Sequence, residues 1–557
     1  MPKHAKTSEE AEMTAENESP AKQRKPFPWK SSIGGVLLVG LAAGVIVAEP
    51  ALKSITTETA TFEAPVADVP SADTVLSCAA TPALVNTDAT TDSQFTADTT
   101  EQTTGVSVGV LSDAGSRIPG VSITSLAEQS ALDGSGESSA TATAKHLTQR
   151  IPEKQATQLL SSGEDGTTNV VGKNISDGRE SFGKLAAQSL GNQPTMISGM
   201  RTTLSRDGDL AGFSSAPCMA PSYDQWLVGA STAAENTSIL TIANPSDSPA
   251  TVSVSVYGST DEEPQVGTLD RLVIAPGAQY STLVGGIVPN DPAVSLRVQS
   301  QGGAVSASIQ QSALRGLIPA GIDTISSGVG ASTDTVVPFV WVQSAAATES
   351  LTSGAEGLAG TELLVSVPGA AAATVKAVAT DASGTKHTIE IPNPLPGGRT
   401  SAVSLDALPA GSYSIRVSAN RSIVAGARTV RGDSVTRAHD SAFIAAGERL
   451  SQRQLVTLPE GGNPYVLLST DDAAASVSLR SLGSDGTLGQ AITHKIAANS
   501  TLMVDTKSFE SSRSFVLDTS GGAVYGGGLS VSGKTGVTAF TFQPSSSATQ
   551  GIPVILP

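Results

Sequence analysis

The stretch from Ser238 to Gly258, SILTIANPSDSPATVSVSVYG, decides the fold class of this chain. It contains an apolar strand, a turn of Asn, Pro, Ser and Asp residues, and a second strand in which Val alternates with Ser. The same pattern returns in Thr361–Gly384, TELLVSVPGAAAATVKAVATDASG, and in Pro464–Gly486, PYVLLSTDDAAASVSLRSLGSDG. Alternation with a period of two predicts strands that bury one face and expose the other. The chain is therefore predicted to be repetitive and all-β.

Each copy continues through an interrupted hairpin and a closing pair of alternating strands, which gives units of about 100 residues with roughly seven strands. Lead-in strands are expected at Trp226–Ala230, Val336–Val342 and Ala442–Ala446. Two sheets that each expose one face to solvent pack their other, apolar faces against each other. We therefore expect tandem immunoglobulin-like or fibronectin-like β-sandwich domains at 222–325, 334–434 and 438–557. Residues 66–221 are less regular, and we expect a diverged β domain with long loops there.

The N-terminal region contains one long apolar segment. Ile33–Ala48 is uncharged, and Ser31 and Ser32 extend it to 18 residues, which is near the short limit for a helix that spans a bilayer. Basic residues precede the segment and Glu49 follows it, which predicts a cytoplasmic N-terminus. We therefore expect a disordered cytoplasmic tail at 1–30, a transmembrane helix at 31–48 and a stalk at 49–65. The alternative is a cleaved signal peptide and a secreted protein.

Cys78 and Cys218 are the two cysteines of the chain. In an oxidising compartment an even pair is most simply a disulfide, and this one would bracket the first β domain. The alternative is two buried free thiols.

Composition limits the partners. The net charge is −17 and the isoelectric point is near 4.8, so the chain repels nucleic acid backbones. No site residue for a catalytic group, cofactor or metal is predicted. Gly528–Thr535 satisfies the phosphate-loop pattern GxxxxGK[ST], but a strand follows it where a helix is needed, so no nucleotide is expected. Gly105–Gly109 satisfies GxSxG, yet Ser107 lies in a strand-like run and lacks a recognisable histidine partner.

Three segments carry a family resemblance: Ala216–Thr232 (APCMAPSYDQWLVGAST), the NPSDSPATVSVSVYG stretch that follows, and Leu314–Asp323 (LRGLIPAGID). Together they resemble an actinobacterial family known as domain of unknown function 5719. The resemblance covers most of the chain beyond residue 66. It implies an envelope protein of a Gram-positive, high-GC bacterium, and it brings no activity, substrate or catalytic residues.

These observations predict a non-enzymatic, membrane-anchored extracytoplasmic protein that acts as a structural or protein-interaction scaffold. Its partner would be an envelope protein or a cell-wall component, contacted through strand edges and loops. The alternative is a ligand-binding receptor or an enzyme whose site lies in the loops of 66–221. The candidate residues of that alternative site are His146, Glu164, Asp165 and Asp207.

Overall fold

The computed structural model forms two compact units, Met1–Ala67 with Gly551–Pro557, and Asp68–Gln550. The structure describes residues 66–67, 72–84, 102–112, 117–129, 144–156, 171–177, 183–191, 195–260, 269–353, 360–509, 512–544 and 552–553. In the first unit, β1 (Val66–Ala67) pairs antiparallel with β34 (Ile552–Pro553). The predicted transmembrane segment 31–48 lies outside the described residues. Among those that are described, no helix is long and apolar enough to span a membrane.

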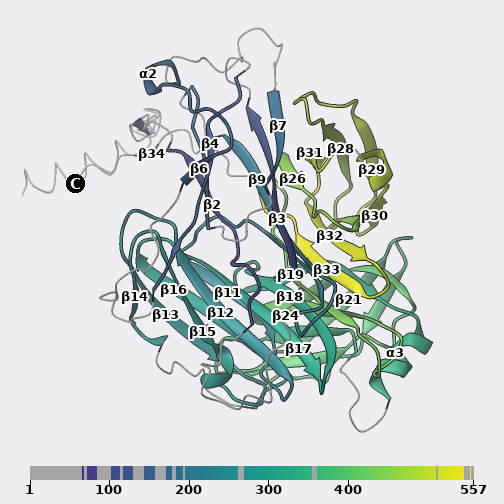
Figure 1. The fold of residues 1–557 in the computed structure, drawn as a ribbon. Coiled ribbons are helices and arrows are strands. Elements are labelled where there is room, and N and C mark those ends of the chain that lie inside the picture. Colours follow the sequence, from purple (N-terminus) through teal and green to yellow (C-terminus); the bar gives the residue numbers. More distant parts are fainter. Residues whose placement is uncertain are drawn as a thin grey trace, which may run out of the picture. The chain divides into compact units, whose positions relative to one another are not determined.

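The second unit contains four successive sets of strands (Figure 1), which we call repeats 1 to 4. Repeat 1 contains β2 (Thr74–Ser77), β3 (Gln102–Ser112), β4 (Val121–Thr124), β6 (Ala144–His146), β7 (Val171–Asp177), β8 (Lys184–Ala187), β9 (Met196–Ser205) and β10 (Gly212–Pro217). It also contributes the short strand β5 (Ala127–Glu128) and helix α2 (Glu153–Ala156). Repeat 2 contains β11 (Asp224–Ala230), β12 (Asn236–Asn244), β13 (Ala250–Tyr257), β14 (Leu272–Ile274), β15 (Ala278–Leu283), the 3-10 helix η2 (Val284–Gly286), β16 (Val294–Gly302), β17 (Ser306–Arg315) and β18 (Ile318–Ser326).

Repeats 3 and 4 follow the same order. Repeat 3 contains β19 (Ser332–Val342), α3 (Ala345–Thr352), β20 (Glu362–Ser366), β21 (Val375–Asp381), β22 (Lys386–Ile389), β23 (Thr400–Ser404), β24 (Gly411–Arg431) and β25 (Asp440–Ala445). Repeat 4 contains β26 (Arg453–Thr457), β27 (Asn463–Thr470), β28 (Ala475–Leu482), β29 (Ile492–Ile496), β30 (Thr501–Val504), η3 (Thr506–Phe509), β31 (Ser514–Gly521), β32 (Val524–Ser532) and β33 (Gly536–Thr541).

All four repeats share one topology. In repeat 2 one sheet has the order β11-β16-β13-β14 and the other β18-β17-β12-β15, and the equivalent strands of repeats 1 and 4 are arranged identically. In repeat 3 the long strand β24 pairs with β19 and β21 in one sheet and with β20 and β25 in the other. β5 of repeat 1 pairs in parallel with β15, so one segment of repeat 1 extends a sheet of repeat 2.

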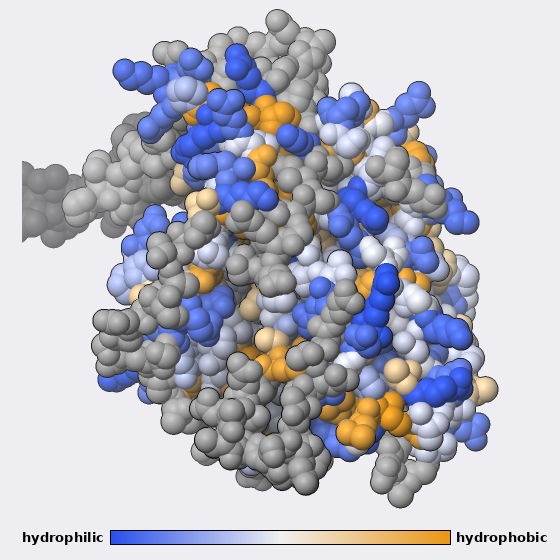
Figure 2. All heavy atoms as spheres, viewed as in Figure 1, coloured by the Kyte–Doolittle hydropathy of each residue, from blue (hydrophilic) through white to orange (hydrophobic). Residues whose placement is uncertain are grey.

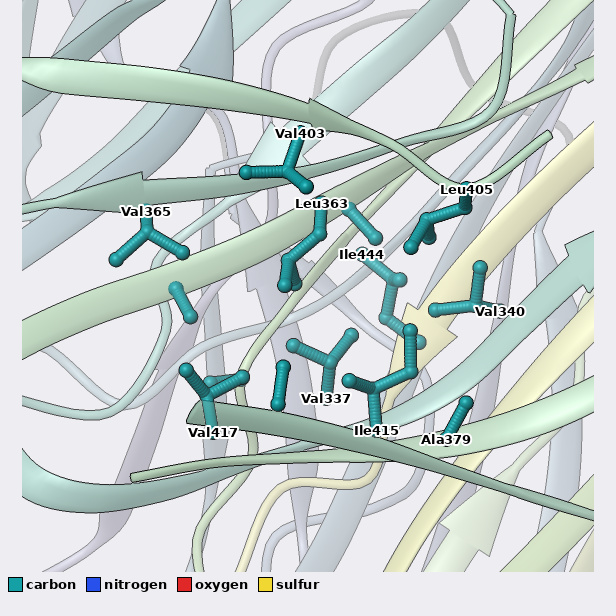
Figure 3. Packing of buried hydrophobic residues seen from close by; sticks show 14 of the residues in the cluster. Val337, Val340, Leu363, Val365, Ala379, Val403, Leu405, Ile415, Val417 and Ile444 are labelled. Atoms are coloured by element: carbon teal, nitrogen blue, oxygen red, sulfur yellow. The ribbon is translucent and has the colours of Figure 1, made fainter. Parts of the chain in front are cut away.

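Alternating side chains explain why these segments form strands with buried cores. In β13, Val252, Val254 and Val256 are fully buried whereas the intervening Ser253 and Ser255 are partly accessible. Figure 3 shows the corresponding core of repeat 3, where Leu363 and Val365 of one sheet face Ile415 and Val417 of the other. On the face shown in Figure 2, hydrophilic residues predominate and hydrophobic ones form small separate patches.

The structure confirms the all-β prediction and the disulfide between Cys78 and Cys218, whose Cα atoms are 4.1 Å apart. It differs from the expected strand assignment in one respect. The segment Ala442–Ala446, expected as the lead-in strand of the last repeat, belongs to β25, which pairs with β24 of repeat 3. The lead-in strand of repeat 4 is β26 instead, because its apolar residues Leu455 and Val456 are buried beside β31. Repeats 1, 2 and 4 thus have eight principal strands each, and in repeat 3 the long strand β24 takes the place of the sixth and seventh. The last strand of every repeat, called the eighth below, also contacts other repeats.

Candidate functional site

The eighth strands of the four repeats meet side by side. β10 contacts β18 and β33, and β25 also contacts β18 and β33, so the four strands form a closed ring. We call them the axial strands. The backbone ladder of each axial strand runs only to a strand of its own repeat. Side-chain hydrogen bonds link the axial strands of different repeats to one another. The ring brings repeats 1 and 4 into direct contact.

Asp440 lies at the centre of this ring and is 1% exposed. Its Oδ2 accepts hydrogen bonds from the backbone N–H groups of Phe213, at 2.8 Å, and Val537, at 3.0 Å. Its Oδ1 accepts from Ile322, at 3.1 Å, and from Ser441, at 2.9 Å. One carboxyl group therefore binds all four axial strands.

Two glycines make room for this carboxyl group. Gly321 has a φ of +110°, and a Cβ there would lie 2.5 Å from Asp440 Oδ1. A Cβ at Gly212 would lie 3.0 Å from the same oxygen. The positive φ is readily adopted by glycine, so the backbone of β18 can approach Asp440 closely.

Asp323, which is fully buried, forms a second link one layer along the axis. Its Oδ2 accepts from the Phe443 backbone N–H at 2.8 Å, and its Oδ1 accepts from the Thr538 hydroxyl at 3.0 Å. Burial raises the pKa of Asp440 to about 8, although its backbone N–H bonds act in the opposite direction. Burial also raises the pKa of Asp323 well above its usual range.

A cavity of about 350 Å³ opens at the carboxyl ends of the axial strands. Residues that directly follow each axial strand line it, including Met219, Val329, Ala446 and Phe542, one from each repeat. We call it the axial cavity. Because binding sites often form where domains meet, this convergence of four repeats is the candidate functional site.

The lining of the axial cavity mixes apolar and polar groups, because Leu76 and Met200 lie beside the hydroxyl groups of Thr74, Ser198 and Thr457 and the amide of Gln225. Asp224 and Glu448, both exposed, supply the carboxylates of the described lining. Asp224 is held by a bidentate pair with Arg297, at 2.9 and 2.5 Å. The cavity thus offers apolar side chains interspersed with hydroxyl and amide groups, with Glu448 and the Arg297-paired Asp224 at its exposed edge, which suits a segment that brings both apolar and hydrogen-bonding groups.

The four candidate residues of the sequence-based alternative are distributed as follows. His146 is exposed in β6, and Asp207 is exposed in the turn between β9 and β10. Neither lines the axial cavity. Glu164 and Asp165 lie outside the described residues. Within the described ranges, no group of three or more His, Cys, Asp or Glu residues is placed to hold a metal ion.

The motif-like segments have structural roles. The phosphate-loop pattern forms the end of β32 and its turn into β33, and the Arg431 guanidinium donates to the carbonyl groups of Gly533 and Gly536 there. Ser107 is buried in β3, where its hydroxyl donates to Glu460 Oε1 of repeat 4 at 2.8 Å. Both segments therefore connect repeats.

Sequence reasoning missed the axial role of Asp440 and Asp323. The run His439-Asp440-Ser441 resembles a catalytic triad in sequence only, because neighbouring strand residues point to opposite faces. A usable signal was present, because each aspartate begins or interrupts an apolar strand, in DSAFIA and in GIDTIS. An acidic residue is rarely buried in such a position without hydrogen-bond partners.

Comparisons with known proteins add a family. The model of a family of unknown function, DUF5719, matches residues 170–507. No curated protein gave a significant match. One solved structure, described as the BSP domain of a biofilm associated protein, matches at 9% identity, with 89% of this chain and 100% of that chain covered and a TM-score of 0.11.

Proposed function

The chain belongs to this family of unknown function, and we propose that it is a non-enzymatic envelope scaffold that holds a protein or wall partner at its axial cavity. In this proposal residues 31–48 anchor the chain in the membrane of an actinobacterium, and the repeats lie outside the cell. Each repeat is built from two sheets, which supports the further proposal that the repeats are immunoglobulin-like or fibronectin-like sandwiches.

The observation that carries the proposal is the composition of the axial cavity. Its walls come from all four repeats, so the repeats must be assembled before the cavity exists. Its lining combines apolar side chains with hydroxyl and amide groups. Such a surface favours a partner segment that places an apolar side chain in the cavity beside groups that donate and accept hydrogen bonds.

Strand edges provide a second kind of contact. Without β5, the strand β15 would be the edge of its sheet. β5 extends this sheet by pairing in parallel with Ala278 and Gln279 of β15. The equivalent strands β23 and β30 end their sheets in repeats 3 and 4. Exposed edges of this kind accept an extended segment of another protein by β-augmentation.

The experiment is a crosslinked pull-down of the chain from its own cell envelope, with a variant that fills the axial cavity. Gly330 lines the cavity, and a Cβ there meets no atom within 4 Å, so Gly330→Phe adds bulk at the cavity from a position with open space around its Cβ. We expect a specific partner that the original chain captures and that Gly330→Phe loses.

Gly369→Phe is the matched control, because Gly369 is an exposed glycine with equally open surroundings and lies outside the axial cavity. It should capture the partner normally. Equal capture by both variants would place the contact elsewhere, and turnover of a wall component by the purified chain would overturn the proposal of a scaffold.

A further inference from the structure

A second cavity, of about 180 Å³, lies between repeats 3 and 4 and away from the axis. Its floor is the outer face of the sheet β22-β21-β24-β19, and its wall is the end of β27 with the turn that leads into β30. The wall is fixed to the floor by the Ser414 hydroxyl, which donates to the Ser469 hydroxyl at 2.9 Å. The Thr501 hydroxyl also donates to the Asp381 carbonyl group. We call this cavity the lateral groove.

The lining of the lateral groove differs sharply from the rest of the chain. Seven of its residues carry hydroxyl groups: Thr380, Ser414, Ser418, Ser469, Thr470, Ser500 and Thr501. Asn499 adds an amide, and Lys376, Lys386 and Arg416 add three positive charges. The described lining contains no carboxylate, although the chain has 51 acidic residues and only 34 basic ones.

The register of the sheet explains how the two lysines come to share one face. Lys386 of β22 lies opposite Thr380 of β21, and Lys376 of β21 lies opposite Ser418 of β24. Thr380 and Lys376 are four residues apart on one strand, so both side chains point to the same face. Both lysines are exposed at the mouth of the groove.

The charges of the groove are not all cancelled by neighbours. Arg416 is paired with Asp334 through two hydrogen bonds, of 2.9 and 2.5 Å, and this pair raises the pKa of Arg416. Asp471 also acts on Arg416 from repeat 4. Within the described residues, Lys376 and Lys386 have no ion-pair partner, so their ammonium groups are available to an anion.

We propose that the lateral groove binds a phosphorylated polyol, such as a glycerol phosphate unit. Lys386 is level with Thr380, about 13 Å along the strand from Lys376 at roughly 3.3 Å per residue, so the two ammonium groups would approach the phosphate from opposite ends of the groove. The hydroxyl groups of Thr380 and Ser418 and the amide of Asn499 would exchange hydrogen bonds with the polyol, because those of Ser414, Ser469, Thr470 and Thr501 are bonded within the protein. The described lining has no aromatic ring on which a sugar could stack, which favours a small flexible polyol. The volume equals that of about six liquid waters at roughly 30 Å³ each, which suits one such unit.

Isothermal titration calorimetry with sn-glycerol 3-phosphate tests this proposal on the full chain, with glycerol and inorganic phosphate as separate probes. We expect saturable binding at one site per chain, weaker binding to phosphate and none to glycerol. Because surface charges are screened by salt, the affinity should fall as salt is raised.

The double variant Lys376→Gln, Lys386→Gln should weaken glycerol phosphate binding by about tenfold or more, since each removed contact is a charge-assisted hydrogen bond. Lys495→Gln, an exposed strand lysine outside the groove, is the matched control and should bind normally. Equal thermal midpoints would show that all variants fold. No binding, equal binding of glycerol, phosphate binding as tight as glycerol phosphate, or an unaffected double variant would each overturn the proposal. The groove lies apart from the axial cavity, so the outcome does not depend on the proposed scaffold function.

Discussion

At the residue scale, Asp440 shows how much of this molecule depends on a single buried carboxyl group. Four N–H groups from four strands point at it, so both of its oxygens are fully used as acceptors. The sequence around Asp440, His-Asp-Ser, gives no hint of this role. The residues that donate to Asp440 include 213, 322 and 537, and only the tertiary structure brings them to residue 440. The buried valines, by contrast, were predictable from their alternation.

The raised pKa of Asp440 predicts a pH dependence of stability. Below about pH 4 the group is protonated in both folded and unfolded chains, whereas at higher pH the unfolded chain releases a proton that the folded chain keeps up to about pH 8. The free energy of unfolding contributed by this group should therefore decrease from pH 4 to pH 8. Urea denaturation at pH 5 and pH 8 measures the difference.

Asp440→Asn removes the titration and is expected to reduce this difference. It should also destabilise the chain by about 2 kcal/mol or more at pH 8, where much of Asp440 in the original chain is ionised and accepts from all four N–H groups, because an amide NH₂ would face two of these donors. Asp472→Asn, in an exposed turn, is the control and should retain the pH dependence. An unchanged slope in Asp440→Asn would mean that this carboxyl group does not titrate in the range.

At the element scale, the strands were largely predictable and their partners were not. The hairpin order within each repeat follows from apolar alternation and turn residues. The eighth strand was misassigned in repeat 3, because Ala442–Ala446 is apolar throughout and fits either a lead-in or a closing strand. Nearly all of β25 is buried between repeats, so its sequence lacks the alternation that identifies a strand with one wet face.

The close approach of β32 and β33 yields a second prediction. A Cβ on Gly528 would overlap the ring of Phe540, which is 2% exposed and stacks on Phe542 with 6.1 Å between ring centroids. Gly528→Ala should lower the free energy of unfolding by about 1 to 3 kcal/mol because the core has no space for the methyl group.

Thermal and denaturant unfolding measure this effect, and Gly330→Ala is the matched control because its Cβ would enter open space. The control should change stability by less than about 0.5 kcal/mol. We assign the phosphate-loop pattern a structural role. If the Gly528→Ala variant were as stable as the original chain and also bound ATP, that assignment would be wrong.

At the scale of the whole molecule, the repeats form a closed assembly. Composition and periodicity predicted tandem β units, and the structure places the first and last of them in contact through β10 and β33. Side chains that join non-consecutive repeats, such as Ser215 with Thr538 and Ser107 with Glu460, carry no periodic signal. Ring closure therefore lay beyond the reach of sequence patterns.

Closure predicts cooperative unfolding of residues 68–550. In a linear array each repeat contacts only its neighbours and melting proceeds in steps. Here the loss of any repeat would remove one of the four hydrogen-bond donors of Asp440, or Asp440 itself, so we expect one calorimetric transition whose van't Hoff and calorimetric enthalpies agree. Separate transitions for individual repeats would show that the axial contacts do not couple them.

Thr74, in the first strand of repeat 1, and Gln543, two residues beyond the last axial strand, line the same axial cavity. The first and last described segments of the four repeats thus lie on one side, which we call the proximal side. The turns that precede the axial strands lie on the distal side, where Leu317 is 92% exposed. If the chain is tethered near Thr74 or Gln543, as the proposed function requires, these turns would lie at the ends of the axial strands that face away from the tether.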